Sequence, residues 1–364
     1  MRIALAGPFA PFRGGIAQFN DRLRAELLSR GHEVTALTFS RQYPGVLFPG
    51  STQYDTSRVG DAAAVLDSVN PISWFTTGRR IRRDAPDALV LAYWTPHLAP
   101  ALAGVAAFAG GRSIGLIHNA LPHDGSALSK PLARLFLGQM DAALTLSDSV
   151  ASDLTSLGFK GQTRVAFHPV YDHFGVGLVK QEARNRLGLE GPGPVLLCLG
   201  LVRPYKGFDL ALDAFADVLA AHPEATLVIA GEAYDGSLDD RLAAAPAAVR
   251  ARVVRENRYI PDAEVPLYYS AADLLVLPYR SATQSGALAA AAHFGLPVVV
   301  SNLPGLAKPV REFEMGTVAG YSEGIAAAIL EALAPDRHAV LSEGGRRMAR
   351  EASWAKFAGE LEKL

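Results

Sequence analysis

Short apolar runs alternate with longer amphipathic segments along the first half of the chain. The runs fall at residues 3–6, 34–39, 88–92, 114–118 and 142–146. Each is short enough to be a buried strand, whereas residues 16–30 place their apolar side chains on one helical face. Repeated strand and helix units of this kind predict an α/β fold, with a parallel sheet covered by helices on both faces.

The pattern loses its period at residues 168–177 and then restarts. Further strands are expected at 195–200, 225–230, 253–259, 274–278 and 297–301, with helices between them. A second doubly wound unit is therefore predicted. We assign residues 1–170 to an N-terminal domain and 171–350 to a C-terminal domain, and we expect residues 351–364 to form a separate terminal helix.

Length and composition agree with two domains. At 364 residues, 49% of them hydrophobic, the chain exceeds the ~250–300 residues at which one hydrophobic core stops growing. The net charge of −1 gives no support to nucleic acid as a partner. The single cysteine, Cys198, favours a reducing compartment. Since no signal peptide or membrane span is evident, we expect a cytoplasmic protein.

Two basic residues follow the predicted strand 195–200. Arg203 and Lys206 stand three positions apart, just before the helix expected at 208–221. In open parallel sheets ligands bind beyond the carboxyl ends of strands, so this loop is a candidate site. Arg offers a planar fork of donors and Lys a point charge, a pair that suits a diphosphate. The alternative is an ordinary solvated surface loop.

A second candidate lies between strand 274–278 and the helix that ends at Gly295. The residues where this helix begins are small or polar: Thr283, Gln284, Ser285 and Gly286. The first N–H groups of a helix are unpaired and carry the positive end of its dipole, which favours a phosphate without any metal. An ordinary helix cap explains the same residues. Their position opposite the Arg203 loop favours the phosphate site.

The loop after the first strand places Gly14 and Gly15 ahead of a helix. Its glycines do not match the G-x-G-x-x-G fingerprint, so a dinucleotide cofactor is not predicted. A plain glycine turn and a loop that lets a ligand approach the backbone are equally supported.

His118 ends the strand 114–118, and His123 and Asp124 follow closely. These residues lack the H-x-x-x-H or H-E-x-x-H spacing of a metal site, so no metal is predicted. His118 is either structural or a hydrogen-bonding group for a polar substrate.

Four segments occur in a fixed order after residue 205: KGFDLALDAF, LVIAGE, YIPDAEVPLYYSAADLLVLPY and AAHFGLPVVVSNLPGL. Together with GGI near the first helix, HN at 118–119 and PVYDHF at 169–174, they resemble the retaining glycosyltransferases of family 4. The similarity covers nearly the whole chain. It implies the GT-B architecture, in which two Rossmann-like domains face a cleft and the terminal helix crosses back to the N-terminal domain.

The resemblance also implies a hexosyltransferase that moves a sugar from a nucleoside diphosphate donor, with no metal or other cofactor. Arg203 and Lys206 match residues that bind the donor diphosphate. His118 matches a residue near the reacting carbon of the donor sugar, and Gly14 and Gly15 match a loop beside the donor phosphates or the acceptor. The acceptor is implied only as a lipid-linked sugar, a polysaccharide precursor or a small metabolite.

One departure from the family pattern falls in the stretch 277–301. The family usually has two glutamates eight positions apart, and those positions are here Ala282 and Ala290. A sub-branch with T-Q-S-G is the better likeness, so Thr283 to Ser285 are expected to supply polar contacts instead. Two other classes stay open: a non-catalytic GT-B subunit that binds a nucleotide or a partner, and a sugar-nucleotide epimerase.

Aromatic residues stand beside a basic cluster in the N-terminal half: Trp74, Phe75, Arg79, Arg80, Arg82 and Arg83. This combination suits an anionic membrane surface, which would place the protein at the cytoplasmic face of a membrane. A solvated helix face is the other interpretation.

Overall fold

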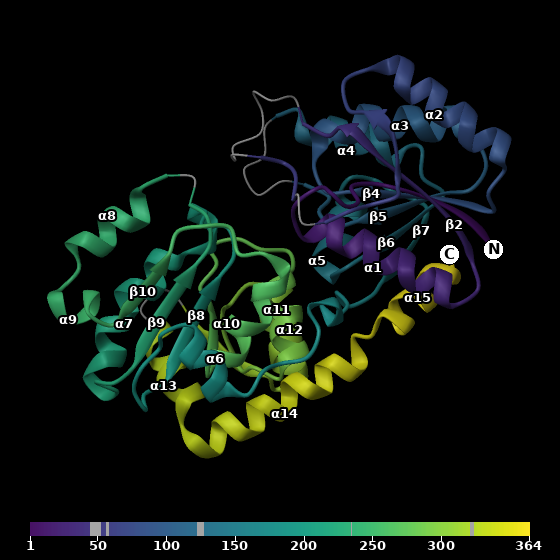
Figure 1. Cartoon of the computed structure of the whole chain (residues 1–364). Coiled ribbons are helices and arrows are strands. Elements are labelled where there is room, and N and C mark those ends of the chain that lie inside the picture. Colours follow the sequence, from purple (N-terminus) through teal and green to yellow (C-terminus); the bar gives the residue numbers. More distant parts are fainter. Residues whose placement is uncertain (44–51, 56–57, 122–126, 234, 321–323) are drawn as a thin grey trace. The chain divides into compact units, whose positions relative to one another are not determined.

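The computed structural model describes residues 1–43, 52–55, 58–121, 127–233, 235–320 and 324–364. The chain forms two compact units (Figure 1). The first comprises Met1–Phe167 and Trp354–Leu364, and the second comprises His168–Ser353. The division after Phe167 falls shortly before the predicted one after residue 170.

The first unit is built on one parallel sheet, whose described strands run in the order β3-β2-β1-β4-β5-β6-β7. The strands are β1 (Arg2–Ala6), β2 (Glu33–Arg41), β3 (Ala63–Asp67), β4 (Ala88–Tyr93), β5 (Ser113–Ile117), β6 (Ala142–Thr145) and β7 (Gln162–Val165). The helices are α1 (Gly15–Ser29), α2 (Pro71–Asp84), α3 (Ala99–Ala109), α4 (Ser129–Leu137), α5 (Asp148–Ser156) and α15 (Trp354–Glu362).

Strand β4 shows why the central strands form a continuous apolar run. Its side chains alternate between two buried clusters, one on each face of the sheet. Leu89, Leu91 and Tyr93 join the cluster that contains residues of α3 and α4. Val90 and Ala92 join the cluster that contains residues of α1 and α15. Both faces of the sheet are therefore buried from solvent, as expected for a parallel sheet between helices.

The terminal helix α15 packs on α1 and so belongs to the first unit. The Phe19 ring lies 4.8 Å from Trp354 and 5.2 Å from Phe357, in edge-to-face geometry. At the end of the helix, Glu362 accepts hydrogen bonds from Arg30 at 2.7 and 2.6 Å. The expected return of the chain to the N-terminal domain is thus confirmed.

The second unit holds another parallel sheet, with described strands in the order β10-β9-β8-β11-β12-β13. They are β8 (Val195–Leu199), β9 (Thr226–Ala230), β10 (Val253–Glu256), β11 (Leu274–Leu277), β12 (Val298–Ser301) and β13 (Gly316–Ala319). The helices are α6 (Lys180–Arg186), α7 (Phe208–Ala221), α8 (Ser237–Ala244), α9 (Ala247–Arg250), α10 (Val265–Ala271), α11 (Gly286–Phe294), α12 (Pro304–Phe313), α13 (Ile325–Leu333) and α14 (Pro335–Glu351).

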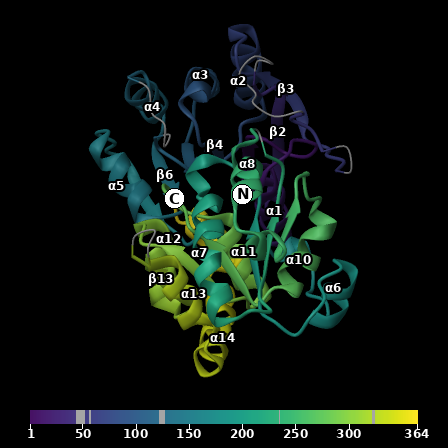
Figure 2. The same cartoon turned by 90° about the vertical axis from the view of Figure 1, so that its left-hand side faces the viewer.

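Helices cover both faces of the second sheet (Figure 2). Helix α7 packs with α13, whereas α10 packs with α6 and α11. The two α/β units confirm the predicted fold class. Within the described parts of the chain, no helix is both long and apolar enough to cross a bilayer.

Candidate functional site

Strand β8 leads into a tight turn that carries Arg203 and Lys206. The turn is a short 3-10 helix, Pro204–Lys206, in which the Lys206 N–H donates to the Arg203 carbonyl at 2.9 Å. Gly207 follows with φ 63°, and a Cβ there would lie 2.1 Å from the Pro278 carbonyl oxygen. Glycine is therefore required, both for the left-handed backbone and for the close approach to the loop after β11.

Lys206 directs its ammonium group back toward the end of β8. The Nζ atom lies 5.9 Å from the centre of the Phe208 ring and 2.7 Å from where a Cβ on Gly200 would stand. Burial lowers the pKa of Lys206 to about 8, and the nearby positive charge of Arg203 lowers it as well. A bound anion would oppose both effects, because an opposite charge stabilises the ammonium form.

Ser285 is the N-cap of α11, which begins at Gly286. Its hydroxyl oxygen accepts a hydrogen bond from the Leu288 N–H at 3.4 Å. Ser285 also forms a hydrogen bond with the Tyr279 side chain. Burial raises the pKa of Tyr279, and this hydrogen bond partly opposes the increase. The structure therefore contains the helix cap that was one interpretation of this segment. A single cap satisfies only part of the first turn, so the helix end stays suited to an anion.

Thr283 and Gln284 lie half-buried in the loop between β11 and α11. The loop packs closely on the start of α12, because a Cβ on Gly305 would lie 2.0 Å from the Thr283 carbonyl oxygen. Gly286 packs closely on Tyr171 in the same way, since a Cβ on this glycine would lie 2.7 Å from the phenol oxygen. The start of α11 therefore leaves no room for a larger residue at either glycine.

Strands β8 and β11 are neighbours in the sheet, with Leu274 opposite Leu196. The loops that follow them leave the same edge, which brings the Arg203–Lys206 turn beside the start of α11. Sequence reasoning missed the residue that joins them. The Arg280 N–H donates to the Tyr205 carbonyl at 2.7 Å, and its guanidinium binds both carboxylate oxygens of Asp209, at 2.8 and 2.6 Å.

The glycine loop of the first unit ends at α1. Gly14 is the N-cap, with φ 108° and ψ 162°, and Gly15 is the first helical residue. Both are exposed. A Cβ on Gly14 would meet nothing within 4 Å, so its backbone conformation, not space, calls for glycine.

His118 directly follows β5, and its N–H donates to the Tyr93 carbonyl at 2.8 Å. The side chain is 3% exposed, and its ring meets Phe19 edge-on at 4.8 Å. The role of His118 beside the donor sugar stays a prediction. His123 and Asp124 lie outside the described residues. Among the residues that are described, no three His, Cys, Asp or Glu side chains group as metal ligands.

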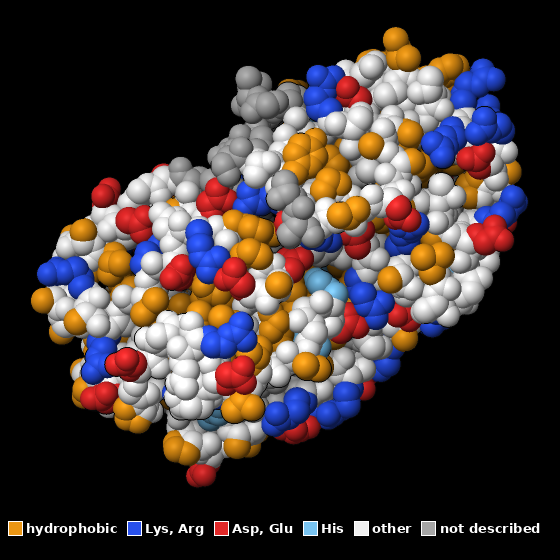
Figure 3. Space-filling view, viewed as in Figure 1, with side chains coloured by type: hydrophobic (Ala, Val, Ile, Leu, Met, Phe, Trp, Pro, Cys, Tyr) orange, Lys and Arg blue, Asp and Glu red, His pale blue; other side chains and the backbone are white. Residues whose placement is uncertain are grey.

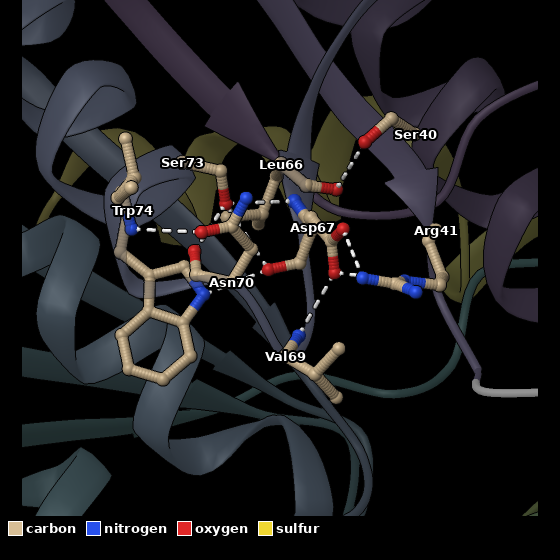
Figure 4. Close-up of polar contacts among 9 residues, drawn as sticks. Ser40, Arg41, Leu66, Asp67, Val69, Asn70, Ser73 and Trp74 are labelled. Carbon is tan, nitrogen blue, oxygen red and sulfur yellow. Dashed lines mark hydrogen bonds and ion pairs between the residues drawn. The ribbon is translucent and has the colours of Figure 1, made fainter.

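Helix α2 carries the aromatic and basic residues that stand together in the sequence. Trp74 is half-buried. Its indole N–H donates to the Asp67 carbonyl at 2.7 Å (Figure 4). Its ring packs against a buried apolar cluster of the first unit. Asp67 also binds Arg41, at 3.0 and 2.6 Å. The Arg82 side chain donates to the Ala109 carbonyl, at 3.2 Å. Arg82 nevertheless stays exposed, as does Phe75.

Comparison with known families gives two matches that together span most of the chain. Residues 13–172 match the family described as Glycosyltransferase Family 4. Residues 193–335 match the family described as Glycosyl transferases group 1. The candidate residues of both units lie inside these two segments.

Two named relatives illustrate the sequence similarity. A D-inositol 3-phosphate glycosyltransferase of Thermobispora bispora is 35% identical over 192 residues, which cover 50% of this chain and 45% of the relative. The chain thus aligns with less than half of that protein's length. A GDP-mannose-dependent alpha-(1-6)-phosphatidylinositol monomannoside mannosyltransferase of Mycolicibacterium smegmatis is 26% identical over 375 residues, covering 95% of this chain and 93% of the relative.

Solved structures share the fold over the full length. HepE of Anabaena in complex with UDP and glucose superposes with a TM-score of 0.78 at 15% identity, covering 99% of this chain and 98% of HepE. Sucrose-phosphate synthase of Thermosynechococcus elongatus gives 0.76 at 17% identity, covering 100% and 98%. At such identities the likeness establishes the GT-B fold alone.

Proposed function

Because the chain belongs to glycosyltransferase family 4, within the glycosyl transferases group 1, we propose that it moves a sugar from a nucleoside diphosphate donor to an acceptor with retention at the anomeric carbon. One observation carries this proposal. The turn with Arg203 and Lys206 follows β8, and the start of α11 follows β11. Because these strands are parallel neighbours, both segments lie at the same edge of the sheet.

The chemistry requires stabilisation of a leaving group. As the bond between sugar and diphosphate breaks, negative charge grows on the diphosphate, and rate is gained by binding that charge more strongly than the ground state. Arg203 and Lys206 supply two positive charges, and the N-terminal N–H groups of α11 supply a third positive region. We propose that these groups replace a metal ion, so a chelator should leave turnover unchanged.

The two alanines in place of glutamates affect the sugar and ribose contacts. Ala290 lies on α11 and is 2% exposed, and its methyl group offers no hydrogen bond to a ribose. Ser285 already caps the helix. We therefore propose Thr283 and Gln284 as the side chains that contact the donor beyond its phosphates.

The exposed face of α2 supports a membrane contact in the first unit. Ile72 is 71% exposed and Phe75 is 41% exposed, and the equally exposed Phe108 of α3 lies against Phe75, with their ring centres 5.1 Å apart. The Arg79 guanidinium lies 5.5 Å from the Phe75 ring, and basic side chains gather with apolar ones over this helix (Figure 3). We propose that this face meets an anionic bilayer, which would suit a lipid-linked acceptor.

Flotation with vesicles tests the membrane contact. Binding to anionic vesicles at low salt, its loss at high salt, and its loss in Ile72→Asp are expected. Val340→Asp, at an apolar residue of α14 that is 45% exposed, is the matched control. Equal flotation of Ile72→Asp and wild type would contradict the contact.

The donor itself can be found by a thermal-shift screen. UDP, GDP and ADP with their sugars form the panel, because named neighbours of this chain bind UDP or ADP and one relative depends on GDP-mannose. A ligand at 100 times its Kd adds about 2.7 kcal/mol of stability. Turnover of a donor would exclude a non-catalytic subunit, and turnover without any acceptor would indicate an epimerase.

A further inference from the structure

Arg280 links the two loops of the candidate donor site. Its N–H donates to the Tyr205 carbonyl at 2.7 Å, and one guanidinium nitrogen donates to the Pro204 carbonyl at 2.8 Å. The same nitrogen and its neighbour donate to Asp209 at 2.8 and 2.6 Å. All of these acceptors belong to the turn after β8 or to the first turn of α7.

We propose that Arg280 is a positioning residue, which fixes the spacing between the Arg203–Lys206 turn and the start of α11. The inference rests on the proposed function, since the spacing matters only if one diphosphate contacts both segments. Arg280 begins the stretch that leads from Tyr279 to the helix cap at Ser285. A shift of this stretch would therefore change the distance between the two halves of the phosphate site.

The guanidinium of Arg280 is already occupied, which separates it from a phosphate ligand. Its two terminal nitrogens form a two-pronged pair with Asp209, and that pair holds the pKa of the Asp209 carboxyl below its usual range. Asp209 also lies in the first turn of α7, where the helix dipole favours a carboxylate. The pair is thus ionised at neutral pH, and Arg280 faces Asp209 rather than a ligand.

Exposure argues against a role in overall stability. The Arg280 and Asp209 side chains are 43% and 29% exposed, and ion pairs of this kind contribute little to folding. Substitutions of the pair should therefore leave the protein folded, while the loop loses the side-chain contacts that restrain it.

Affinity measurements on Arg280→Ala and Asp209→Asn test the proposal. The probe is whichever of UDP, GDP or ADP binds wild type, together with its free nucleoside. Each variant should weaken diphosphate binding by roughly fivefold and leave nucleoside binding unchanged. The double variant should be no weaker than either single one, because both act through the same contact.

The matched controls are Arg241→Ala and Asp213→Asn. These residues form a second two-pronged pair that starts from the same helix α7, and it is also exposed. Neither change should alter diphosphate affinity. Their melting temperatures give the reference for losing one such pair.

The outcomes separate three cases. If Asp209→Asn tightens or preserves diphosphate binding while Arg280→Ala weakens it, Arg280 is a ligand and the positioning role is wrong. If both variants behave like the controls while Lys206→Ala weakens binding, the positioning role is again wrong but the donor site stands. If none of the diphosphates binds wild type, or Lys206→Ala has no effect, the proposed function fails and the positioning role with it.

Discussion

The ammonium nitrogen of Lys206 lies 6.0 Å from the centre of the Tyr279 ring. Lys206 belongs to the turn after β8, and Tyr279 to the loop after β11. The two loops thus meet in a cation–aromatic contact, close to the Gly207 approach to Pro278. Substitutions in either loop should therefore affect the same ligand.

Lys206→Ala should lower kcat/KM for the donor by roughly a hundredfold. Removing one charge-assisted contact to a developing negative charge costs on the order of 2–4 kcal/mol, and about 1.4 kcal/mol is a factor of ten. Initial rates at low donor concentration measure this loss. Lys160→Ala, at an exposed lysine of the first unit, is the control. Unchanged rates for Lys206→Ala would exclude Lys206 from the site.

Diphosphate binding should weaken as the pH rises through about 8, the value to which burial and Arg203 lower the pKa of Lys206. Only the ammonium form attracts an anion. In Lys206→Arg the charge persists, so this weakening should disappear even if the affinity itself changes. Calorimetric titrations from about pH 6.5 to about 9.5 measure the slope. Parallel slopes for the two proteins would contradict this assignment.

The lowered pKa of Lys206 also determines how the stability of the unliganded protein changes with pH. Lys206 has a pKa near 10.5 when unfolded and about 8 when folded. Between these values the unfolded state binds more protons, so Lys206 contributes stability that increases as the pH rises. Denaturant midpoints should therefore show a steeper rise for wild type than for Lys206→Met over this range. A flat difference between the two would show that the pKa is not depressed.

Gly207→Ala should destabilise the second unit by about 1–3 kcal/mol, because the left-handed backbone strains any other residue. The added Cβ would also lie 2.1 Å from the Pro278 carbonyl oxygen. Thermal unfolding measures the effect. Gly236→Ala is the control, since its φ is −85° and its nearest neighbour would be 3.9 Å away. Similar melting temperatures for both variants would contradict the close approach.

Trp354→Ala should release α15 from α1 and destabilise the first unit by about 3–5 kcal/mol, the usual cost of removing a buried aromatic side chain. Trp354 is 2% exposed and meets Phe19 at 4.8 Å. Protection of α1 amides from hydrogen exchange reports the contact locally. Lys356→Ala, at an exposed residue of the same helix, should leave that protection intact. Full protection in Trp354→Ala would show that α15 is dispensable.

The sequence identifies the buried central strands more readily than the edges. Strands β8 and β11 are wholly buried and appear as unbroken apolar runs. The edge strands β3 and β7 were not predicted, because their half-exposed residues give no such run. β13 was missed as well, because Gly316 and Thr317 leave it without an unbroken apolar run.

The sequence predicts the site only where its residues directly follow a recognisable strand. Arg203 and the start of α11 follow neighbouring strands, so their adjacency follows from topology. The Arg280–Asp209 pair spans 71 positions and depends on the register of two strands, which a single sequence does not reveal. Trp74 and Phe75 are successive residues of a helix and so point about 100° apart, which explains why only one of them is a surface aromatic.

Titration of the diphosphate found in the screen into wild type and into the Arg203→Ala/Lys206→Ala double variant tests the central claim most directly. If these two side chains hold the donor diphosphate, the double variant should bind it at least a hundredfold more weakly, roughly what the loss of two charge-assisted contacts implies. Affinity for the free nucleoside should stay the same. Equal diphosphate affinity in both proteins would contradict the assignment of the donor site.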